Sequence, residues 1–335
     1  MFQRILVPLD GTSLAEEALP IAARLASVAS AELLLVRVVM PPLEQDMLAV
    51  EPERLIAQSL EADLEEARAY LKRVITYEHL DATRVRTEVL EGLPALSILH
   101  LAQREQVDLI IIRSHGDSGL KRWLLGSMAQ QLMRSSSIPL LILHEGREAP
   151  GMNLMLLMHP PRILVTLDGS PVAEKVLIPA AQLCAALAQP ERGTIHLTYT
   201  VKRLSNGEEQ KGGRDNANKE NRAQAEVYLE RVKQRFVTGD LAPLHLTVTT
   251  SVVHHAERAD IWKRVIEESQ CIGDSPGYTG CDIIAMATHG RHGLQRLIEG
   301  SVTEQVMDGT HYPLLVVHMS KVEDSFNEVS EAKHV

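Results

Sequence analysis

The chain has 335 residues, a formal net charge of −10 at pH 7 and a pI near 5.8. An acidic chain has no electrostatic basis for nonspecific binding to nucleic acid, so any bound anion must be held by local geometry. Its three cysteines have no Cys-x-x-Cys spacing, which argues against a disulfide framework and a cysteine-rich metal site.

The first half of the chain alternates between short apolar runs and amphipathic segments. Ser13 and Glu16 have the spacing of a capping box, which predicts a helix from residue 13 with apolar positions continuing to residue 26. Further helices are expected at 52–77, 93–105 and 127–135, and strands at 4–9, 32–39, 84–90, 107–113 and 140–143.

The second half has the same order of elements. Helices are expected at 171–188, 223–236, 256–268 and 301–307, and strands at 162–167, 194–201, 244–253, 282–287 and 314–317. Continuous aliphatic strands that alternate with amphipathic helices predict a parallel sheet covered on both faces. The expected fold is therefore α/β, with two tandem doubly wound domains, in which ligands bind beyond the carboxyl ends of the strands.

An internal repeat supports this division. Residues 4–11 recur as 162–169 with one substitution, at an offset of 158 residues, and residues 138–144 return as 312–318 at an offset of 174. We expect the net insertion of sixteen residues (174 − 158) in the polar stretch at about 203–221. The expected domains are 1–146 and 161–319, joined by a linker at 147–160 and followed by a polar tail at 320–335.

The most distinctive part of the repeat is a glycine-containing loop. Residues 114–116, Ser-His-Gly, are followed after nine residues by Gly126 and Ser127; residues 288–290, Thr-His-Gly, are followed after nine by Gly300 and Ser301. Ser127 and Ser301 each precede Gln or Glu by three residues, which predicts helix N-caps where backbone N–H groups favour an anion. A purely structural role, with capping serines and turn-forming glycines, is the alternative.

Together, a first strand ending in Leu-Asp-Gly, a fourth strand ending in Ser/Thr-His-Gly, the Gly-Ser pair and a final Pro-Leu-Leu strand resemble the universal stress protein family. The resemblance covers about residues 3–144 and 161–318. It implies a Rossmann-like, adenine-nucleotide alpha hydrolase-like fold in each half. The family pattern is Gly-x2-Gly-x9-Gly-[Ser/Thr], and this chain departs from it at the first glycine, which is Arg113 in one half and Ala287 in the other.

The resemblance also implies binding residues for ATP or another adenine nucleotide, with or without Mg²⁺. Asp10 and Asp168 correspond to a carboxylate that contacts the adenosine; a turn-forming aspartate is the alternative. Val38 and Val201 correspond to a valine whose backbone meets the adenine. The phosphate-loop candidates are Gly116, Gly126 and Ser127 in the first half and Ala287, His289, Gly290, Gly300 and Ser301 in the second. Arginine at 113 departs further from glycine than alanine at 287, so the second half is the stronger candidate.

Three functions remain open at this stage. The first is an ATP-binding stress-response regulator with little turnover, in which catalytic residues are absent and hydrolysis is at most weak. The second is an interaction scaffold without ligand, which Arg113 favours. The third is a nucleotide-dependent enzyme, although no Walker lysine or nucleophile motif supports it.

The expected partners follow from the same resemblance. The final strands at 140–143 and 314–317 are apolar and would otherwise leave exposed sheet edges, so the two halves are expected to pair within the chain, with or without further homo-oligomerisation. No nucleic-acid or membrane partner is expected. The chain enters a predicted strand without the pattern of a secretory signal, which predicts a cytoplasmic protein.

Overall fold

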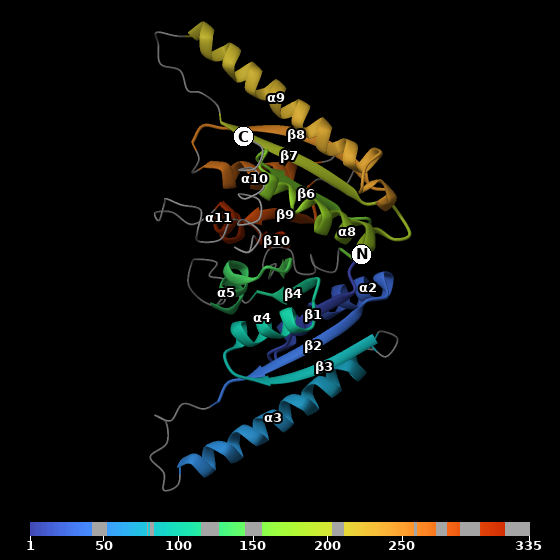
Figure 1. Cartoon of the computed structure of the whole chain (residues 1–335), viewed down its shortest axis with the longest axis vertical. Coiled ribbons are helices and arrows are strands. Elements are labelled where there is room, and N and C mark those ends of the chain that lie inside the picture. The colour runs from blue at the N-terminus through green and yellow to red at the C-terminus, as the bar shows by residue number, and fades with distance from the viewer. Residues whose placement is uncertain are drawn as a thin grey trace, which may run out of the picture. The chain divides into compact units, whose positions relative to one another are not determined.

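A computed structural model describes residues 1–41, 52–78, 80, 84–114, 127–144, 156–202, 211–257, 260–272, 280–288 and 302–318. It divides into two compact units (Figure 1), and among the described residues the first extends to residue 144 and the second begins at residue 156. Each unit contains five strands that alternate with helices. The expected α/β fold with two tandem doubly wound domains is confirmed.

In unit 1 all strand pairs are parallel and the strand order is β3-β2-β1-β4-β5. The chain runs outward from the central strand through β2 and β3, then returns to its other side for β4 and β5. The switch point therefore lies between β1 and β4. The elements are β1 Arg4–Pro8, α1 Ser13–Glu16, α2 Leu19–Ala29, β2 Glu32–Val39, α3 Pro52–Tyr77, β3 Arg84–Glu91, α4 Pro94–Arg104, β4 Leu109–Arg113, α5 Ser127–Ser135 and β5 Leu140–Leu143.

Unit 2 repeats this topology, with parallel pairs in the order β10-β9-β6-β7-β8 and its central strand at β6. Its elements are β6 Arg162–Leu167, α7 Pro171–Glu174, α8 Leu177–Ala188, β7 Thr194–Lys202, α9 Lys211–Val237, a 3-10 turn at Ala242–Leu244, β8 Thr247–His255, α10 Ile261–Cys271, β9 Ile283–Thr288, α11 Val302–Gly309 and β10 Leu314–His318. Residues 5–7 of β1 and 163–165 of β6 are fully buried, and they form the centre of each core.

The helix expected at 171–188 is divided in two, and the helix expected from residue 13 is divided in the same way into α1 and α2. A proline lies in the first turn of each second helix, at Pro20 and Pro179. Proline cannot donate a backbone hydrogen bond, so it fits at a helix start and not within a continuous helix. By length and composition the stretch 171–188 could span a membrane, but 56% of that stretch is buried in the protein, as in a core helix.

The expected place of the insertion is wrong. The segment between β7 and α9, residues 203–210, has 8 residues, against 12 in the segment between β2 and α3, residues 40–51. The polar run continues into α9, which begins at Lys211 and not at residue 223. The connection before β9, residues 272–282, has 11 residues against 4 at 105–108. The polar composition marked an exposed helix, and the extra length lies after it.

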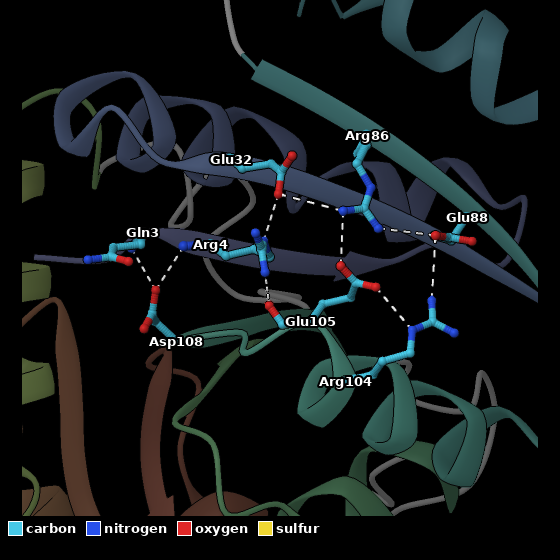
Figure 2. Close-up of polar contacts among 8 residues, drawn as sticks. All are labelled: Gln3, Arg4, Glu32, Arg86, Glu88, Arg104, Glu105 and Asp108. Carbon is cyan, nitrogen blue, oxygen red and sulfur yellow. Dashed lines mark hydrogen bonds and ion pairs between the residues drawn. The ribbon is translucent and has the colours of Figure 1, made fainter.

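The amino-terminal edge of each sheet is fastened by one aspartate. Asp108 accepts hydrogen bonds from the backbone nitrogens of Gln3 and Arg4, at 2.6 and 2.8 Å (Figure 2). Its counterpart Asp282 accepts from the backbone nitrogen of Arg162 at 2.7 Å. This repeated contact ties the start of the central strand to the strand beside it, so the carboxyl ends of both strands are held in register at the opposite edge.

Unit 1 adds a chain of ion pairs along the same edge. Figure 2 shows Arg86 between Glu32, Glu88 and Glu105, with Arg104 linking Glu88 to Glu105. The hydrogen bond from Arg86 lowers the pKa of the Glu105 carboxyl below its usual range. Solvent screens such pairs, and each contributes little to stability. The network belongs to the edge opposite the strand ends where a ligand would bind, so we assign it to strand alignment.

Candidate functional site at the carboxyl ends of the strands

The two predicted aspartates form the same turn at the end of each central strand. Asp10 Oδ1 accepts from the backbone nitrogen of Thr12 at 2.9 Å and from its hydroxyl at 2.6 Å. Asp168 Oδ1 accepts from the backbone nitrogen of Ser170 at 2.9 Å. Both carboxylates remain exposed to solvent. The turn-forming role is therefore present, and it holds each carboxylate in a fixed place at the switch point.

The second residue after the aspartate caps the first helix of each unit. Thr12 accepts from the backbone nitrogen of Ala15 at 3.2 Å, and Ser170 accepts from that of Ala173 at 3.1 Å. The N-cap of α1 is Thr12, so the capping box expected from Ser13 is wrong. In unit 1 the Thr12 hydroxyl makes both contacts: it donates to Asp10, and its oxygen accepts from the first turn of the helix. Carboxylate and helix start are thus positioned together.

A glycine with positive φ follows each aspartate, with φ of +91° at Gly11 and +85° at Gly169. A side chain at Gly11 would meet Arg37 Nη1 at 2.9 Å, and one at Gly169 would meet the Tyr199 hydroxyl at 2.8 Å. The positive φ is what favours glycine here, because the neighbouring atoms are the ends of flexible side chains that can shift. The repeated Asp-Gly pair is therefore a geometric requirement of the turn.

The second strand of each unit ends beside this turn. Glu32 pairs with Arg4, and Thr194 pairs with the equivalent arginine, Arg162. Equivalent residues of β2 and β7 are therefore 162 positions apart (194 − 32). The counterpart of Val38 is therefore Thr200, and Val201 lies one position further along. Because neighbouring strand residues face opposite sides of a sheet, the assumed equivalence of Val38 and Val201 is wrong.

Arg113, at the position of the missing glycine, turns away into the protein. Its side chain is 3% exposed; Nε donates to Glu17 Oε2 at 2.9 Å, and Nη1 donates to the carbonyl oxygen of Leu143 at 3.2 Å. In unit 2 the corresponding residues are Ala287 and Lys175. Unit 1 thus has an arginine and a glutamate, bound to each other, at two positions where unit 2 has an alanine and a lysine. The guanidinium of Arg113 is already occupied by protein groups.

A second repeated cluster, which the motif analysis missed, lies on the long helix beside the turn. Tyr70 donates to Glu16 Oε1 at 2.8 Å. At an offset of 158 residues, Tyr228 lies beside Glu174. The Cζ atom of Arg73 lies 5.8 Å from the centre of the Tyr70 ring, and that of Arg231 lies 5.0 Å from the centre of the Tyr228 ring. The sequence signal was available: residues 67–74 and 225–232 share Ala-x-x-Tyr-Leu-x-Arg-Val, with five of eight positions identical.

Burial keeps these tyrosines protonated. Removal from water raises the pKa of Tyr70 and of Tyr228 well above the usual range, and the neighbouring glutamate raises it further in each case. Burial likewise raises the pKa of Tyr199, with a contribution from Asp168. All three phenols are therefore neutral hydrogen-bond donors at physiological pH, and none is placed to act as a base.

The loop candidates His115, Gly116 and Gly126 lie outside the described residues, as do His289, Gly290, Gly300 and Ser301. Of Ser127, only its backbone position at the start of α5 is described. Ser114 and Thr288, which precede these loops in the first and second unit, are both buried. Among the residues that the structure describes, no group of three His, Cys, Asp or Glu side chains is placed to hold a metal ion.

Comparison with known proteins identifies the family. The model of the universal stress protein family matches residues 1–144 and again residues 160–318, so the chain belongs to this family and contains two of its domains in tandem. Among curated relatives, universal stress protein MJ0531 of Methanocaldococcus jannaschii is 30% identical over 148 residues, which are 44% of this chain and 85% of that protein. Universal stress protein YxiE of Bacillus subtilis is 30% identical over 146 residues, 42% of this chain and 99% of that protein.

Solved structures resemble the whole chain as well. A universal stress protein from Archaeoglobus fulgidus DSM 4304 covers 95% of this chain and 98% of its own, with a TM-score of 0.63 at 16% identity. At this identity the likeness shows the fold. A universal stress protein solved in complex with cAMP matches 43% of this chain and 97% of its own, at 23% identity and a TM-score of 0.30.

Proposed function

We propose that the chain is an adenine-nucleotide-binding regulator of the stress response, with ATP as the leading ligand and little or no turnover. The observation that supports this most directly is the repeated Asp-Gly turn, which holds an exposed carboxylate at the switch point of each sheet. A carboxylate at this place accepts hydrogen bonds from ribose hydroxyls or an exocyclic amine. The duplicated Gly-Ser loop would hold the phosphates.

The second domain is the stronger binding site in this proposal. Ala287 is a small residue at the start of the phosphate loop, close in size to the glycine of the family pattern, whereas the equivalent Arg113 is large, buried and bound to Glu17. The closed arrangement around Arg113 predicts weaker ATP binding in the first domain, and an interaction or scaffold role without ATP is the alternative there. The two domains would then have different tasks within one chain.

Slow turnover follows from the chemistry of the described residues. Phosphoryl transfer needs a group that orients the attacking water and concentrated positive charge around the phosphates, usually with Mg²⁺. The described carboxylates at the strand ends hold turns, and the nearby tyrosines are kept protonated. We expect any hydrolysis to be well below the enzyme range of about 1–10³ per second.

Mass spectrometry of nucleotide retained through purification, followed by calorimetric titration with ATP, tests the proposal. Asp168→Ala removes the second-domain carboxylate and should weaken ATP binding by about tenfold, the loss expected for a hydrogen bond to a charged group. Asp10→Ala should have a smaller effect. Asp63→Ala is the matched control, because Asp63 is an exposed aspartate on α3 with no place at the strand ends.

A second pair of variants tests the asymmetry. Ala287→Arg places a large side chain at the start of the second loop and should abolish most ATP binding, while Arg113→Ala should leave it unchanged. A chain that retains no nucleotide and shows no heat with ATP would refute nucleotide binding and leave the scaffold role. Equal losses from Asp10→Ala and Asp168→Ala would refute the preference for the second domain.

A further inference from the structure

One position of the second strand, next to the aspartate turn, carries a different kind of side chain in each domain. Arg37 in β2 and Tyr199 in β7 are equivalent, since the offset between these strands is 162 residues (199 − 37). Both side chains lie against the glycine after the site aspartate. One domain therefore has a cation beside its carboxylate, and the other has a neutral hydroxyl.

Arg37 is held at this place by an aromatic ring. Its Cζ atom lies 4.9 Å from the centre of the Tyr70 ring, and that of Arg73 lies 5.8 Å from the same centre. Stacking on the ring already limits the orientations of this long side chain, so less conformational entropy is lost when it binds a ligand. Arg37 is thus presented beside Asp10 in a largely fixed geometry.

The arginines beside this ring lack the ion pair that their counterpart has in the second domain. Neither Arg37 nor Arg73 has an ion-pair partner among the described part of the chain. In the second domain, Arg231 forms an ion pair with Glu174 at 2.9 Å, and Tyr199 donates to the carbonyl oxygen of Asp168 at 3.0 Å. An anion beside the turn would find a guanidinium in the first domain and a satisfied phenol in the second.

We infer that Arg37 makes the first domain selective for an adenosine phosphorylated on its ribose, at the 2′ or 3′ oxygen. Asp10 accepts a hydrogen bond from a free hydroxyl, and the guanidinium of Arg37 binds the phosphate on the neighbouring oxygen, a pairing that arginine forms with two parallel hydrogen bonds. Tyr199 gives the second domain a preference for an unmodified ribose. This inference rests on the proposed nucleotide function.

Titration calorimetry on the full chain, in an Asp168→Ala background that weakens the second site, measures this selectivity with 3′-AMP and adenosine as probes. Arg37→Gln should weaken 3′-AMP binding by about tenfold or more and change adenosine binding by less than about twofold. Arg37→Lys keeps the charge and should retain part of the preference. Arg68→Gln is the matched control, because it removes the same charge from the exposed face of α3.

The reciprocal variant Tyr199→Arg, in an Asp10→Ala background, should give the second domain a preference for 3′-AMP over adenosine. Thermal unfolding of each variant identifies loss of fold as a separate cause. Adenosine binding with an unchanged ratio of 3′-AMP to adenosine affinity in Arg37→Gln would refute the selectivity and leave the nucleotide function standing. Absence of binding by adenosine, 3′-AMP and ATP in the unmodified chain would refute both.

Discussion

The contact between Arg113 and Glu17 predicts unequal effects from removing its two members. The Arg113 side chain is 3% exposed in the structure. In Glu17→Ala its guanidinium keeps only the carbonyl oxygen of Leu143 as a described partner. Arg113→Met leaves a carboxylate that is 50% exposed and can be rehydrated by water. A buried charge without its partner is costly, whereas an apolar side chain of similar size in its place is not.

The structure gives approximate magnitudes for both variants. A hydrogen bond to a charged group contributes about 1.5–3 kcal/mol, and since solvent screens Glu17, we expect Glu17→Ala to lower the free energy of unfolding by about 2 kcal/mol. The Leu143 carbonyl retains a hydrogen bond from the backbone nitrogen of Ser114 at 2.9 Å. Arg113→Met should therefore cost about 1 kcal/mol or less. Glu17→Gln, which retains an acceptor oxygen, should fall between the wild type and Glu17→Ala.

Urea unfolding followed by circular dichroism measures these differences, and hydrogen exchange of a peptide containing β4 assigns them to the first domain. The double variant Glu17→Ala with Arg113→Met should be within about 0.5 kcal/mol of Arg113→Met alone, because removal of Glu17 no longer leaves a buried arginine without its carboxylate. A larger loss for Arg113→Met than for Glu17→Ala would refute the assignment of a buried, charge-dependent contact.

Three further predictions follow. Gly11→Ala and Gly169→Ala should each lower the free energy of unfolding by about 1–2 kcal/mol, since alanine resists positive φ; urea titration measures the loss, and an effect below about 0.3 kcal/mol would contradict it. The hydrogen bond from His196 lowers the pKa of Glu268, so the ionised carboxylate stabilises the second domain above its unfolded pKa of about 4.3, and this stabilisation is lost as the pH falls through the folded pKa. The difference in free energy of unfolding between the wild type and Glu268→Gln should therefore shrink between pH 7 and pH 3. A difference that stays constant over this range would contradict the prediction. Expressed separately, the halves 1–146 and 161–319 should form dimers through their final strands, and monodisperse monomers in size-exclusion chromatography would refute the pairing.

Much of the fold could be predicted because the strands of a doubly wound domain are continuous aliphatic runs. Leu109–Arg113 and Leu314–His318 lie within one or two residues of where the pattern placed them. Helix starts were less accurate, since Thr12 and Ser13 are both good caps, and the hydrogen bond that Thr12 donates to Asp10 is what distinguishes them in the structure. A long polar helix such as α9 cannot be recognised from apolar periodicity when its first turns contain no aliphatic residue.

The candidate site was predictable where the backbone dictates the residue, and less so where side chains meet across elements. The Asp-Gly turns follow from local geometry and were found in both halves. The contact of Arg113 with Glu17 joins residues 96 positions apart, and that of Tyr70 with Glu16 joins residues 54 apart. No local pattern contains such pairs, although the repeated Ala-x-x-Tyr-Leu-x-Arg-Val segment shows that comparing the two halves would have revealed the tyrosine.

The differences between the two domains at positions 17 and 113 are coordinated. Where one domain has Arg113, it also has Glu17 to bind it; where the other has Ala287, it has Lys175 in place of the glutamate. A buried arginine without its partner would destabilise the fold, so the two positions must change together. Arg37 differs from Arg113 in this respect, because no ion pair with a described carboxylate accompanies its replacement by Tyr199 in the second domain. Arg37 stacks on Tyr70 and lies beside the repeated turn of Asp10, and the further role that we propose for it is to bind an anionic ligand there.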